Sequence, residues 1–567
     1  MQENKGSFPV QTVIRLADYG AVPDTGEDTQ LAMRRAIEAA AALARPALIE
    51  CAAGRYDFYT DEAVRAPYYI TNTASETENP DITRTIGLLF RGLCNVTLDG
   101  KGALFVFHGK QTMFVIDACE QIEIRNLHVD YHCPTVVEMT VVESGSHHLD
   151  VRVHPDSHYE IENGRLFWIG DGWRFHEGPM QQFERESGTT WRIDNLIEQA
   201  TFAEEKEPGL LRLNFVKAPV LPVGAVLQAR DGIRDQVGVL MVESRDVRWH
   251  HVGMHFMHGL GMVGQFSENL TLENVELAPR LETGRTVAAF ADFVHLSGCR
   301  GTIRVADCRF AGAHDDAINV HGTYLRIVGQ PEDNRIRVRF MHPQTYGIKA
   351  FHPGDAVDFV RGATLEHYAD NVVKSVRIIS QREIELSLQQ AVPSDIRQGD
   401  AVENVTWTPE VEIVRNRFTG IPTRGILVST CRRVLIEDNE FDRMAMSAIL
   451  VADEAWEWYE SGRVADLSIR GNRFIACGST ELAVILIKPE APELGDQVQI
   501  HRHIRIERNE FMLNEAAALD ARHTDELVFI DNSIACTQKA PTEENTIRLT
   551  SCTGIELSGN RYRQGNR

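Results

Sequence analysis

The sequence predicts an all-β protein, a parallel β-helix with a capping helix at its N-terminal end and two inserted small β-barrel modules. One observation is a phrase, an apolar strand ending in Asn-x-aromatic or a close variant, that recurs from residue 410 onward. A second is its interval, which is 23 residues at its shortest and longer where loops are inserted. A third is that two long stretches interrupt this rhythm. Alternating strands at such intervals are typical of a solenoid.

The repeats run from "EVEIVRNRF" at residue 410 to "GIELSGNRY" at residue 554. Coils that stack at the strand spacing of about 4.8 Å place equivalent side chains in columns inside the solenoid. Each Asn amide can then satisfy its neighbours, whereas an isolated buried Asn would be costly. The predicted column comprises Asn416, Asn439, Asn472, Asn509, Asn532 and Asn560, and earlier copies have Leu127, Val252, Val275 and Cys308 at this position.

The N-terminal part, residues 1–131, is expected to hold the cap and the first coils. The segment "DTQLAMRRAIEAAAALA" has apolar residues at helical spacing, with Asp28 as a plausible N-cap. A solenoid must cover the open end of its core, so we expect this helix to close the N-terminal end.

Two stretches, residues 132–240 and 323–408, contain short alternating strands and turn residues instead of coils. We expect each to form a small barrel-like module, inserted on either side of central coils at 241–322. The last coils then occupy 409–567. Since the second insertion directly follows "DDAINVHG", it could wall a pocket over those aspartates.

Composition limits the partners of the chain. Its 567 residues are 43% hydrophobic, its formal net charge is −23, and no basic stripe interrupts that balance. Nucleic acid is therefore not expected, because phosphate binding needs clustered positive charge. The ten scattered cysteines form no CxxC pair, and no apolar run is long enough to insert into a membrane. A homo-oligomer is compatible with the sequence.

The compartment is left open. The start "MQENKGSFPV" lacks the basic and apolar segments of a signal peptide. A secreted or periplasmic location after removal of such a peptide is equally compatible.

The stretch "AGAHDDAINVHG" at 311–322 contains the candidate catalytic acids. Asp292 precedes Asp315 by 23 residues, the bare coil length, so the two are expected to stack about 5 Å apart and to disturb each other's ionisation. Neighbouring strand residues point to opposite faces, so Asp316 shares the pocket only if the chain bends. The small residues at 311–313 make a bend plausible.

Other interpretations of these acids are weaker. A solvated turn is the usual role of an adjacent Asp pair, but the coil-length spacing favours a site. Calcium would need further oxygen ligands at fixed spacing, which the sequence lacks, so no metal and no cofactor is predicted. Three acids in one cleft are the equipment for glycoside hydrolysis, in which one carboxylic acid protonates the leaving oxygen and a carboxylate activates water.

Four phrases in chain order make the resemblance specific: "DDAINVHGTYLRI", "HPQTYGIKAFHPGD", "TRGILVST" and "WYESG". On a β-helix with two inserted barrels they resemble glycoside hydrolase family 110, the α-1,3-galactosidases, from the segment "DYGAVPDTGEDTQ" to the last coils. The resemblance implies a right-handed parallel β-helix. It also implies an exo-acting, inverting enzyme that removes terminal α-1,3-linked galactose from blood group B or linear α-galactosyl glycans.

Roles follow by analogy with polygalacturonases, which use three aspartates on the same scaffold. Asp315 would be the general acid, and Asp292 and Asp316 would together hold and deprotonate the attacking water. Inverting carboxyl groups stand about 6.5–9.5 Å apart, so side-chain direction, and not coil rise, is expected to set the acid–base separation.

Further residues are candidates for substrate binding, each with a structural alternative. Polar groups near the acids could bind hydroxyls or be satisfied inside the coil, Arg424 could instead form a surface ion pair, and a tryptophan could stack on sugar or pack under its loop. These candidates are Asn319, His321, Arg424, Trp458, Glu460, Tyr346 and Gln344.

Alternative functions remain open at this point. The polygalacturonase phrases G-H-G and R-I-K are absent, and a net charge of −23 disfavours an anionic polymer. An α-N-acetylgalactosaminidase, an algal galactan-active enzyme, a polysaccharide lyase and a noncatalytic glycan-binding β-helix use similar scaffolds. The preferred aglycone is not readable from the sequence.

Overall fold

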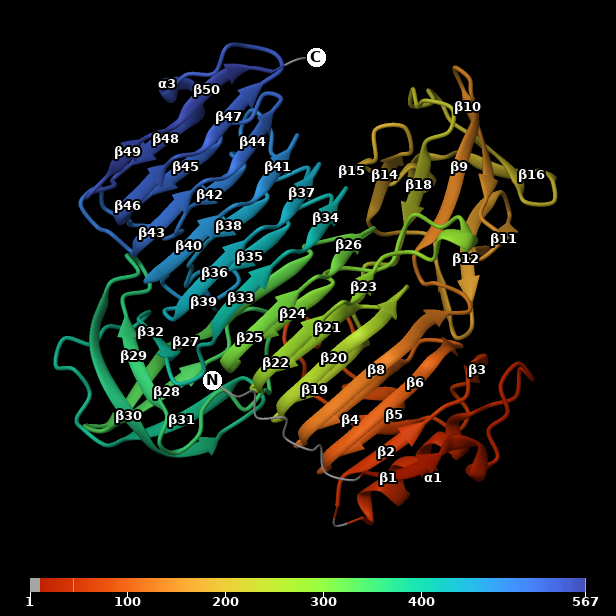
Figure 1. Cartoon of the computed structure of the whole chain (residues 1–567), viewed down its shortest axis with the longest axis horizontal. Helices are drawn as coiled ribbons and strands as arrows, with labels where there is room; N and C mark the ends of the chain where they lie inside the picture. The colour runs from red at the N-terminus through yellow and green to blue at the C-terminus, as the bar shows by residue number, and fades with distance from the viewer. Residues whose placement is uncertain (1–10, 44, 566–567) are drawn as a thin grey trace, which may run out of the picture.

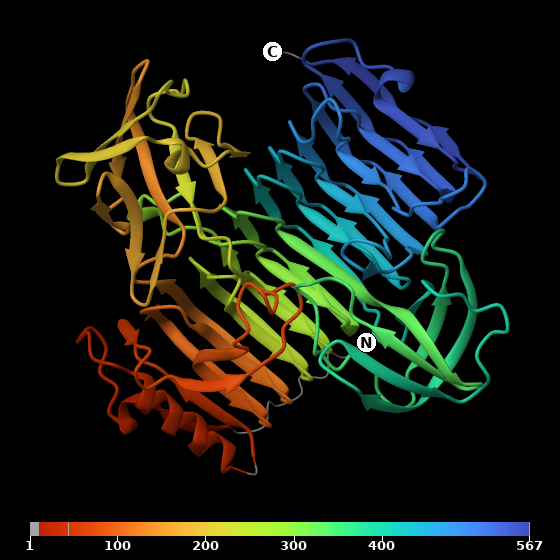
Figure 2. The same cartoon turned by 180° about the vertical axis from the view of Figure 1, so that it is seen from behind.

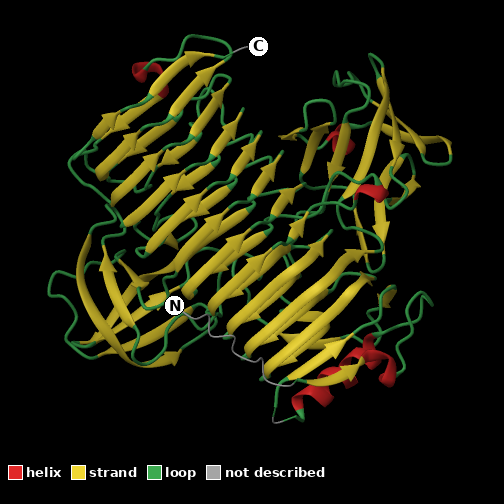
Figure 3. Ribbon diagram, viewed as in Figure 1, coloured by secondary structure: helices red, strands yellow, loops and turns green. Residues whose placement is uncertain are grey.

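The computed structural model describes residues 11–43 and 45–565, so the N-terminal segment without a signal-peptide pattern lies outside the described residues. The chain forms a long solenoid whose successive coils pair in parallel, with one module on each side (Figures 1 and 2). Strands dominate and helices are few (Figure 3). The predicted parallel β-helix is confirmed.

One long parallel sheet runs the length of the solenoid. Its twenty-two strands are β1 (Thr12–Arg15), β2 (Ala47–Glu50), β3 (Arg55–Phe58), β6 (Cys94–Phe107), β8 (Glu120–Tyr131), β20 (Arg245–Met254), β22 (Glu268–Glu273), β23 (Glu276–Leu277), β25 (Arg300–Ala306), β26 (Arg309–Ala311), β33 (Glu410–Val414), β34 (Arg417–Thr419), β36 (Arg433–Glu437), β37 (Glu440–Asp442), β40 (Asp466–Arg470), β41 (Arg473–Ile475), β43 (His501–Glu507), β44 (Glu510–Leu513), β46 (Thr524–Ile530), β47 (Ser533–Cys536), β49 (Glu556–Ser558) and β50 (Arg561–Gln564).

A second series of strands lines the face that carries the candidate site. It comprises β4 (Val64–Pro67), β5 (Thr83–Arg91), β7 (Thr112–Asp117), β19 (Val237–Val242), β21 (Leu260–Gln265), β24 (Val294–Ser297), β27 (Ile318–Glu332), β35 (Ile426–Val428), β38 (Ile449–Val451), β42 (Ile485–Ile487), β45 (Leu519–Arg522) and β48 (Ile547–Thr550). A short strand, β39 (Glu460–Ser461), pairs antiparallel with β27.

The predicted Asn column is present, and all of its members except the last, Asn560, are buried. The side-chain oxygen of Asn439 accepts from the backbone N–H and the amide of Asn416, at 2.8 and 3.0 Å, and its own amide donates to Asn472. The same pattern continues through every later copy to Asn560. Beside it runs a stack of phenylalanine rings whose centroids lie 4.6–5.1 Å apart, formed by Phe310, Phe418, Phe441, Phe474 and Phe511. Successive coils thus bury their Asn and Phe side chains against the equivalent residues of the next coil.

The helix α1 (Gln30–Ala41) lies against the first coil at the N-terminal end of the solenoid (Figure 3). It buries Met33, Ala36 and Ile37 toward the core. Thr29 is the N-cap by backbone position, but its side chain makes no capping hydrogen bond. The side chain of the predicted N-cap, Asp28, instead accepts a hydrogen bond from the backbone N–H of Gln30. The remaining helices are the single turns η1 (Leu16–Tyr19), α2 (Leu196–Gln199), η2 (Leu281–Thr283) and α3 (Glu543–Thr546), and no described helix is long and apolar enough to cross a membrane.

The first inserted module is antiparallel and has its own core around Trp168. A seven-stranded sheet joins a three-stranded sheet that contacts β16. The larger sheet comprises β9 (Val137–Ser144), β10 (His148–Val153), β14 (Met180–Glu184), β15 (Thr189–Ile193), β16 (Phe202–Glu207), β17 (Leu210–Asn214) and β18 (Val226–Ala229), and the smaller one β11 (His158–Glu162), β12 (Arg165–Gly170) and β13 (Trp173–Phe175).

The second inserted module is a closed barrel of six antiparallel strands. It begins with the second half of β27, so one strand leaves the solenoid and enters the barrel without a break. The others, in chain order, are β28 (Arg335–Arg339), β29 (Ala356–Val360), β30 (His367–Ile378), β31 (Glu383–Leu388) and β32 (Ala401–Asn404), and β32 pairs back with β27.

Candidate active site

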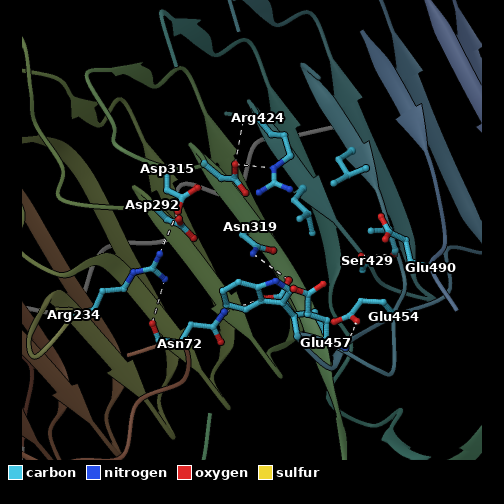
Figure 4. A pocket seen from close by; sticks show the side chains of 16 residues that line it. Asn72, Arg234, Asp292, Asp315, Asn319, Arg424, Ser429, Glu454, Glu457 and Glu490 are labelled. Atoms are coloured by element: carbon cyan, nitrogen blue, oxygen red, sulfur yellow. Dashed lines mark hydrogen bonds and ion pairs between the residues drawn. The ribbon is translucent and has the colours of Figure 1, made fainter. Parts of the chain in front are cut away.

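A cavity of about 240 Å³ opens over β24, β27, β35 and β38. In the close view, Asp292 and Asp315 lie on one side, Glu454 and Glu490 on the other, and Asn319 between them (Figure 4). Seven of the predicted residues line the cavity: Asp292, Asp315, Asp316, Asn319, Arg424, Trp458 and Glu460.

The backbone register corrects one expectation about the acids. Val294 pairs with Ile318, and the Phe293 amide donates to the Asp316 carbonyl, so Asp292 stands opposite Asp316 and not opposite Asp315. The 23-residue spacing missed this, because this coil is one residue longer than the bare unit. Asp315 therefore lies outside the column that Asp292 and Asp316 form. The chain bends at this point, after Gly312, whose φ is +83°. The expected bend therefore brings both neighbouring acids to one cavity.

Arginines from distant segments hold the two neighbouring acids. Arg192 of β15 and Arg234, on the return from the first module, donate to the two carboxylate oxygens of Asp315 at 3.0 and 3.2 Å. Arg424 donates to Asp316 Oδ1 through its backbone N–H and through Nε, at 3.1 and 2.9 Å. These contacts fix both carboxyl groups toward the cavity.

The surroundings shift the pKa values of the three aspartates in different directions. Burial, and then the charge of Asp315, raise the pKa of Asp292 to about 7. Burial raises the pKa of Asp316 to about 6, against the opposing charge of Arg424. Burial acts on Asp315 in the same direction, but the guanidinium groups of Arg234 and its neighbours outweigh it and hold the pKa of Asp315 below its usual value. The site therefore keeps protonated and ionised carboxyl groups side by side near neutral pH.

The polar wall below the acids has unused hydrogen-bonding capacity. Glu460 accepts from Asn72 at 2.9 Å and from Asn319 at 3.4 Å. The carbonyl oxygen of the Asn319 side chain and Oε1 of Glu454 are buried, and neither has a partner among the described residues. Buried polar atoms are normally paired, so these two are suited to a polar ligand. Trp458 is 40% exposed, which leaves ring surface for a sugar.

Three predicted binding residues lie outside the cavity wall. His321 is buried behind it, against His295. Gln344 donates to Glu78, and Tyr346 packs on the guanidinium of Arg382. The loop that carries Gln344 and Tyr346 contacts the segment around Asn72 through Thr345, and it therefore supports the wall from behind. His342, in the same loop, stacks on the cavity residue Trp458, with 4.2 Å between the ring centroids. This contact joins the loop to the cavity wall.

Several cavity residues were not predicted. Asn72 lies between β4 and β5, Arg234 in the return from the first module, and Glu454 and Glu457 in the loop before β39. Asn72 and Arg234 belong to no motif, and only their long-range contacts reveal them. The phrase "DEAWEWYESG" was the one available signal, since it placed Glu454 and Glu457 beside the predicted Trp458.

Two groups of side chains within the described residues are close enough to be considered as metal ligands: His295, His321 and Glu460, and Glu143, His148 and Asp150. In the first, the two Nε2 atoms lie 3.0 Å apart, a hydrogen-bond length, whereas two nitrogens around a tetrahedral ion at about 2.0–2.1 Å are about 3.3–3.4 Å apart. In the second, Arg212 neutralises Asp150 with two bonds of 2.7 Å. Neither geometry favours an ion.

Family models and relatives match this chain along most of its length. Models of the GLAA-B beta-barrel domain I, the GLAA-B beta-barrel domain II and the right handed beta helix region match residues 137–227, 335–402 and 401–566. An alpha-1,3-galactosidase A of Bacteroides thetaiotaomicron is 39% identical over 95% of both chains. One of Streptomyces avermitilis is 32% identical over 98% of this chain and 92% of its own. The A-module of mannuronan C-5 epimerase AlgE4 of Azotobacter vinelandii aligns over 98% of this chain and 97% of its own, with a TM-score of 0.42 and 10% identity.

The relatives cover nearly the whole chain, including both modules and the coils that carry the aspartates. The chain therefore belongs to the α-1,3-galactosidase family that its sequence resembles, glycoside hydrolase family 110.

Proposed function

We propose that the protein is an exo-acting, inverting α-1,3-galactosidase that removes terminal α-1,3-linked galactose from oligosaccharides or glycoconjugates of blood group B or linear α-Gal type. The observation that carries the proposal is the convergence of three aspartates in one small cavity, two of them buried and the third, Asp315, partly buried. At about 240 Å³ the cavity is below the range of about 300–1,000 Å³ that drug-sized ligands occupy, which suits a single sugar ring.

Asp292 and Asp316 are assigned to the attacking water, and Asp315 to the leaving oxygen. The first two stand opposite each other in one column and can converge on one water molecule. Asp315 is displaced from that column, which supports a role on the other side of the scissile bond. Its ion pairs with Arg192 and Arg234 oppose a proton at rest. In this assignment substrate entry displaces Arg192, whose side chain is 55% exposed, and Asp315 takes up a proton.

The polar wall is assigned to hydroxyl recognition. A galactose hydroxyl can donate to the bare oxygen of Asn319, and Trp458 can cover an apolar face of the sugar. Glu454 and Glu457, farther from the acids, would face the aglycone side.

The test is hydrolysis of a Galα1,3Gal disaccharide and of the branched B trisaccharide, with the released anomer followed by NMR. We expect β-galactose first, and loss of about 10³-fold or more of activity in Asp315→Asn, since acid catalysis contributes about 10²–10⁴-fold. Asp466→Asn, at an exposed strand position, is the matched control. With a 4-nitrophenyl galactoside, whose leaving group needs little protonation, Asp315→Asn should regain activity and Asp316→Asn should not. Release of α-galactose, or full activity in Asp315→Asn, would overturn the proposal.

A further inference from the structure

A hydrogen-bond chain leads from Asp292 along the face of β24 and β27 that also carries Asn319, opposite to the face that packs in the solenoid core. Nδ1 of His295 lies 2.9 Å from Oδ2 of Asp292, and Nε2 of His295 lies 3.0 Å from Nε2 of His321. Nδ1 of His321 in turn contacts the backbone carbonyl of Gly322. Both histidines are buried, with 1% and 2% of their surface exposed, so no bulk water enters the chain.

The carbonyl at the far end fixes where the protons sit. A carbonyl oxygen only accepts, so Nδ1 of His321 must carry the hydrogen. A neutral His321 then has a bare Nε2, which accepts from Nε2–H of His295. A neutral His295 with hydrogen on Nε2 has a bare Nδ1, and this can pair with Asp292 only if Asp292 is protonated. If Asp292 is ionised, His295 must hold the proton instead.

We propose that His321 and the Gly322 carbonyl lock His295 in the tautomer that keeps one proton in the hydrogen bond between His295 and Asp292, which makes His295 the positioning and proton-holding residue for Asp292. This inference rests on the proposed function, in which Asp292 acts on the attacking water.

The charges around the pair agree with this arrangement. Burial lowers the pKa of His295 to about 4, whereas the pKa of Asp292 is raised to about 7, so the proton rests on Asp292 in the free site. Glu460, 3.6 Å from His321, favours a cation on the histidines, as do Asp315 and Asp316, and Arg234 opposes it. On the neighbouring strands His295 pairs with Val263 of β21 and Asn319 of β27, which carry no charge.

The proton balance of a turnover closes with this pair. The proton moves from Oδ2 of Asp292 to Nδ1 of His295, which gives a carboxylate and an imidazolium without any other change. As water attacks, Asp292 takes one water proton, and Asp315 gives its proton to the leaving oxygen. Solvent then returns a proton to Asp315 and removes the extra proton from the Asp292–His295 pair. Asp292 thus becomes a base without losing its hydrogen bond.

Neutron diffraction from deuterated crystals of the whole protein tests the chain without any substrate. We expect deuterium on Nδ1 of His321, on Nε2 of His295, and between His295 and Asp292. Deuterium on Nε2 of His321 with none on its Nδ1 would overturn the inference. So would a metal peak between the two Nε2 atoms, which would make the cluster an ion site.

Variants supply the catalytic readout. We expect His295→Phe, which keeps ring volume but removes the partner of Asp292, to lower kcat by about 10- to 100-fold with KM little changed, a part of what base catalysis contributes. His321→Gln keeps an acceptor for Nε2–H of His295 and should retain most activity, whereas His321→Phe should not. His501→Phe, at another buried histidine that does not line the cavity, is the control and should leave the pH profile unmoved.

The two failures are distinguishable. If wild type releases no galactose, the proposed function fails, and the neutron map still decides the proton positions. If wild type is active but His295→Phe keeps both kcat and the pH profile, only the chain fails. If His295→Phe and His501→Phe lose the same activity and the same Tm, the role of His295 is structural, which also refutes the inference.

Discussion

Glu403 provides a test of electrostatics outside the candidate active site. This residue of β32 is 1% exposed, and neither carboxylate oxygen has a hydrogen-bond partner among the described residues. The nearest basic nitrogen, Nε2 of His367, is 4.0 Å away. Burial, with the charge of Asp453 nearby, raises the pKa of Glu403 from 4.5 to about 7 despite the opposing effect of His367. The folded state therefore prefers the protonated form, and we predict that Glu403→Gln stabilises the protein at alkaline pH.

The magnitude follows from the two pKa values. A carboxyl group whose pKa is raised on folding favours the folded state below the unfolded pKa, and this advantage is lost as pH rises through the folded pKa. With values of 4.5 and about 7, ionisation of Glu403 costs about 3 kcal/mol at pH 8 but only about 1 kcal/mol at pH 5. Gln cannot ionise, so Glu403→Gln should recover this difference. At about 2.1 cal/mol/K per residue, 3 kcal/mol corresponds to about 2–3 °C in Tm if the chain unfolds cooperatively.

The assay is calorimetric Tm between pH 5 and pH 8 for wild type, Glu403→Gln and Glu410→Gln, the last being an exposed strand position. The gain in Tm of Glu403→Gln over wild type should grow about threefold across this range, while Glu410→Gln should follow wild type. A gain that does not depend on pH, or a loss at pH 8, would refute the assignment of a raised pKa to Glu403.

Three further predictions concern the site and the scaffold. The three aspartates hold a single proton mainly between the pKa of Asp316, about 6, and that of Asp292, about 7, so kcat/KM should be bell-shaped in pH with limbs near these values, measured with a neutral galactoside. Arg424→Met removes the cation that lowers the pKa of Asp316, so the acid limb should move to higher pH, and denaturant unfolding should show a loss of about 3–5 kcal/mol because a buried charge is left unpaired. Asn439→Ala leaves the N–H groups of Asn416 without an acceptor and should cost about 2–4 kcal/mol in the same assay, with activity per folded molecule unchanged.

The coils could be predicted from the sequence because each coil is stabilised by contacts with equivalent residues of the next coil. Each Asn and each Phe of the column contacts its copy one coil away, so the same contact recurs in the sequence at each interval. These recurring contacts make it possible to predict both the β-helix and the coils that carry the aspartates. They did not reveal the register of Asp292, because one extra residue in a single coil moves the partner from Asp315 to Asp316 and no repeat records it.

The cavity wall could be predicted only where it lies on the coils themselves. Asn319 and Arg424 were accessible because they sit on β27 and next to β35, directly beside the acids. Asn72 and Arg234 reach the same cavity from segments without any repeat, and the hydrogen bond from Asn72 to Glu460 joins positions 388 residues apart. Gln344 and Tyr346 were predicted to line the cavity, but their loop lies behind the residues that do. The sequence shows that this loop follows the aspartates, but not whether it contacts the cavity or packs behind its wall.

The insertions explain how an open solenoid face can act on the end of a chain. Stacked coils alone form a long groove along one face, which would accept the middle of a polymer. Here the first module supplies Arg192 and Arg234 at the aspartates, and the second supplies His342 behind Trp458. Because each wall is anchored by ion pairs or ring stacking to residues of the site, loss of a wall should lower affinity for the terminal sugar before it affects the coils. In the proposed function the modules therefore leave room for a single ring, while the coils set where its anomeric carbon would meet the acids.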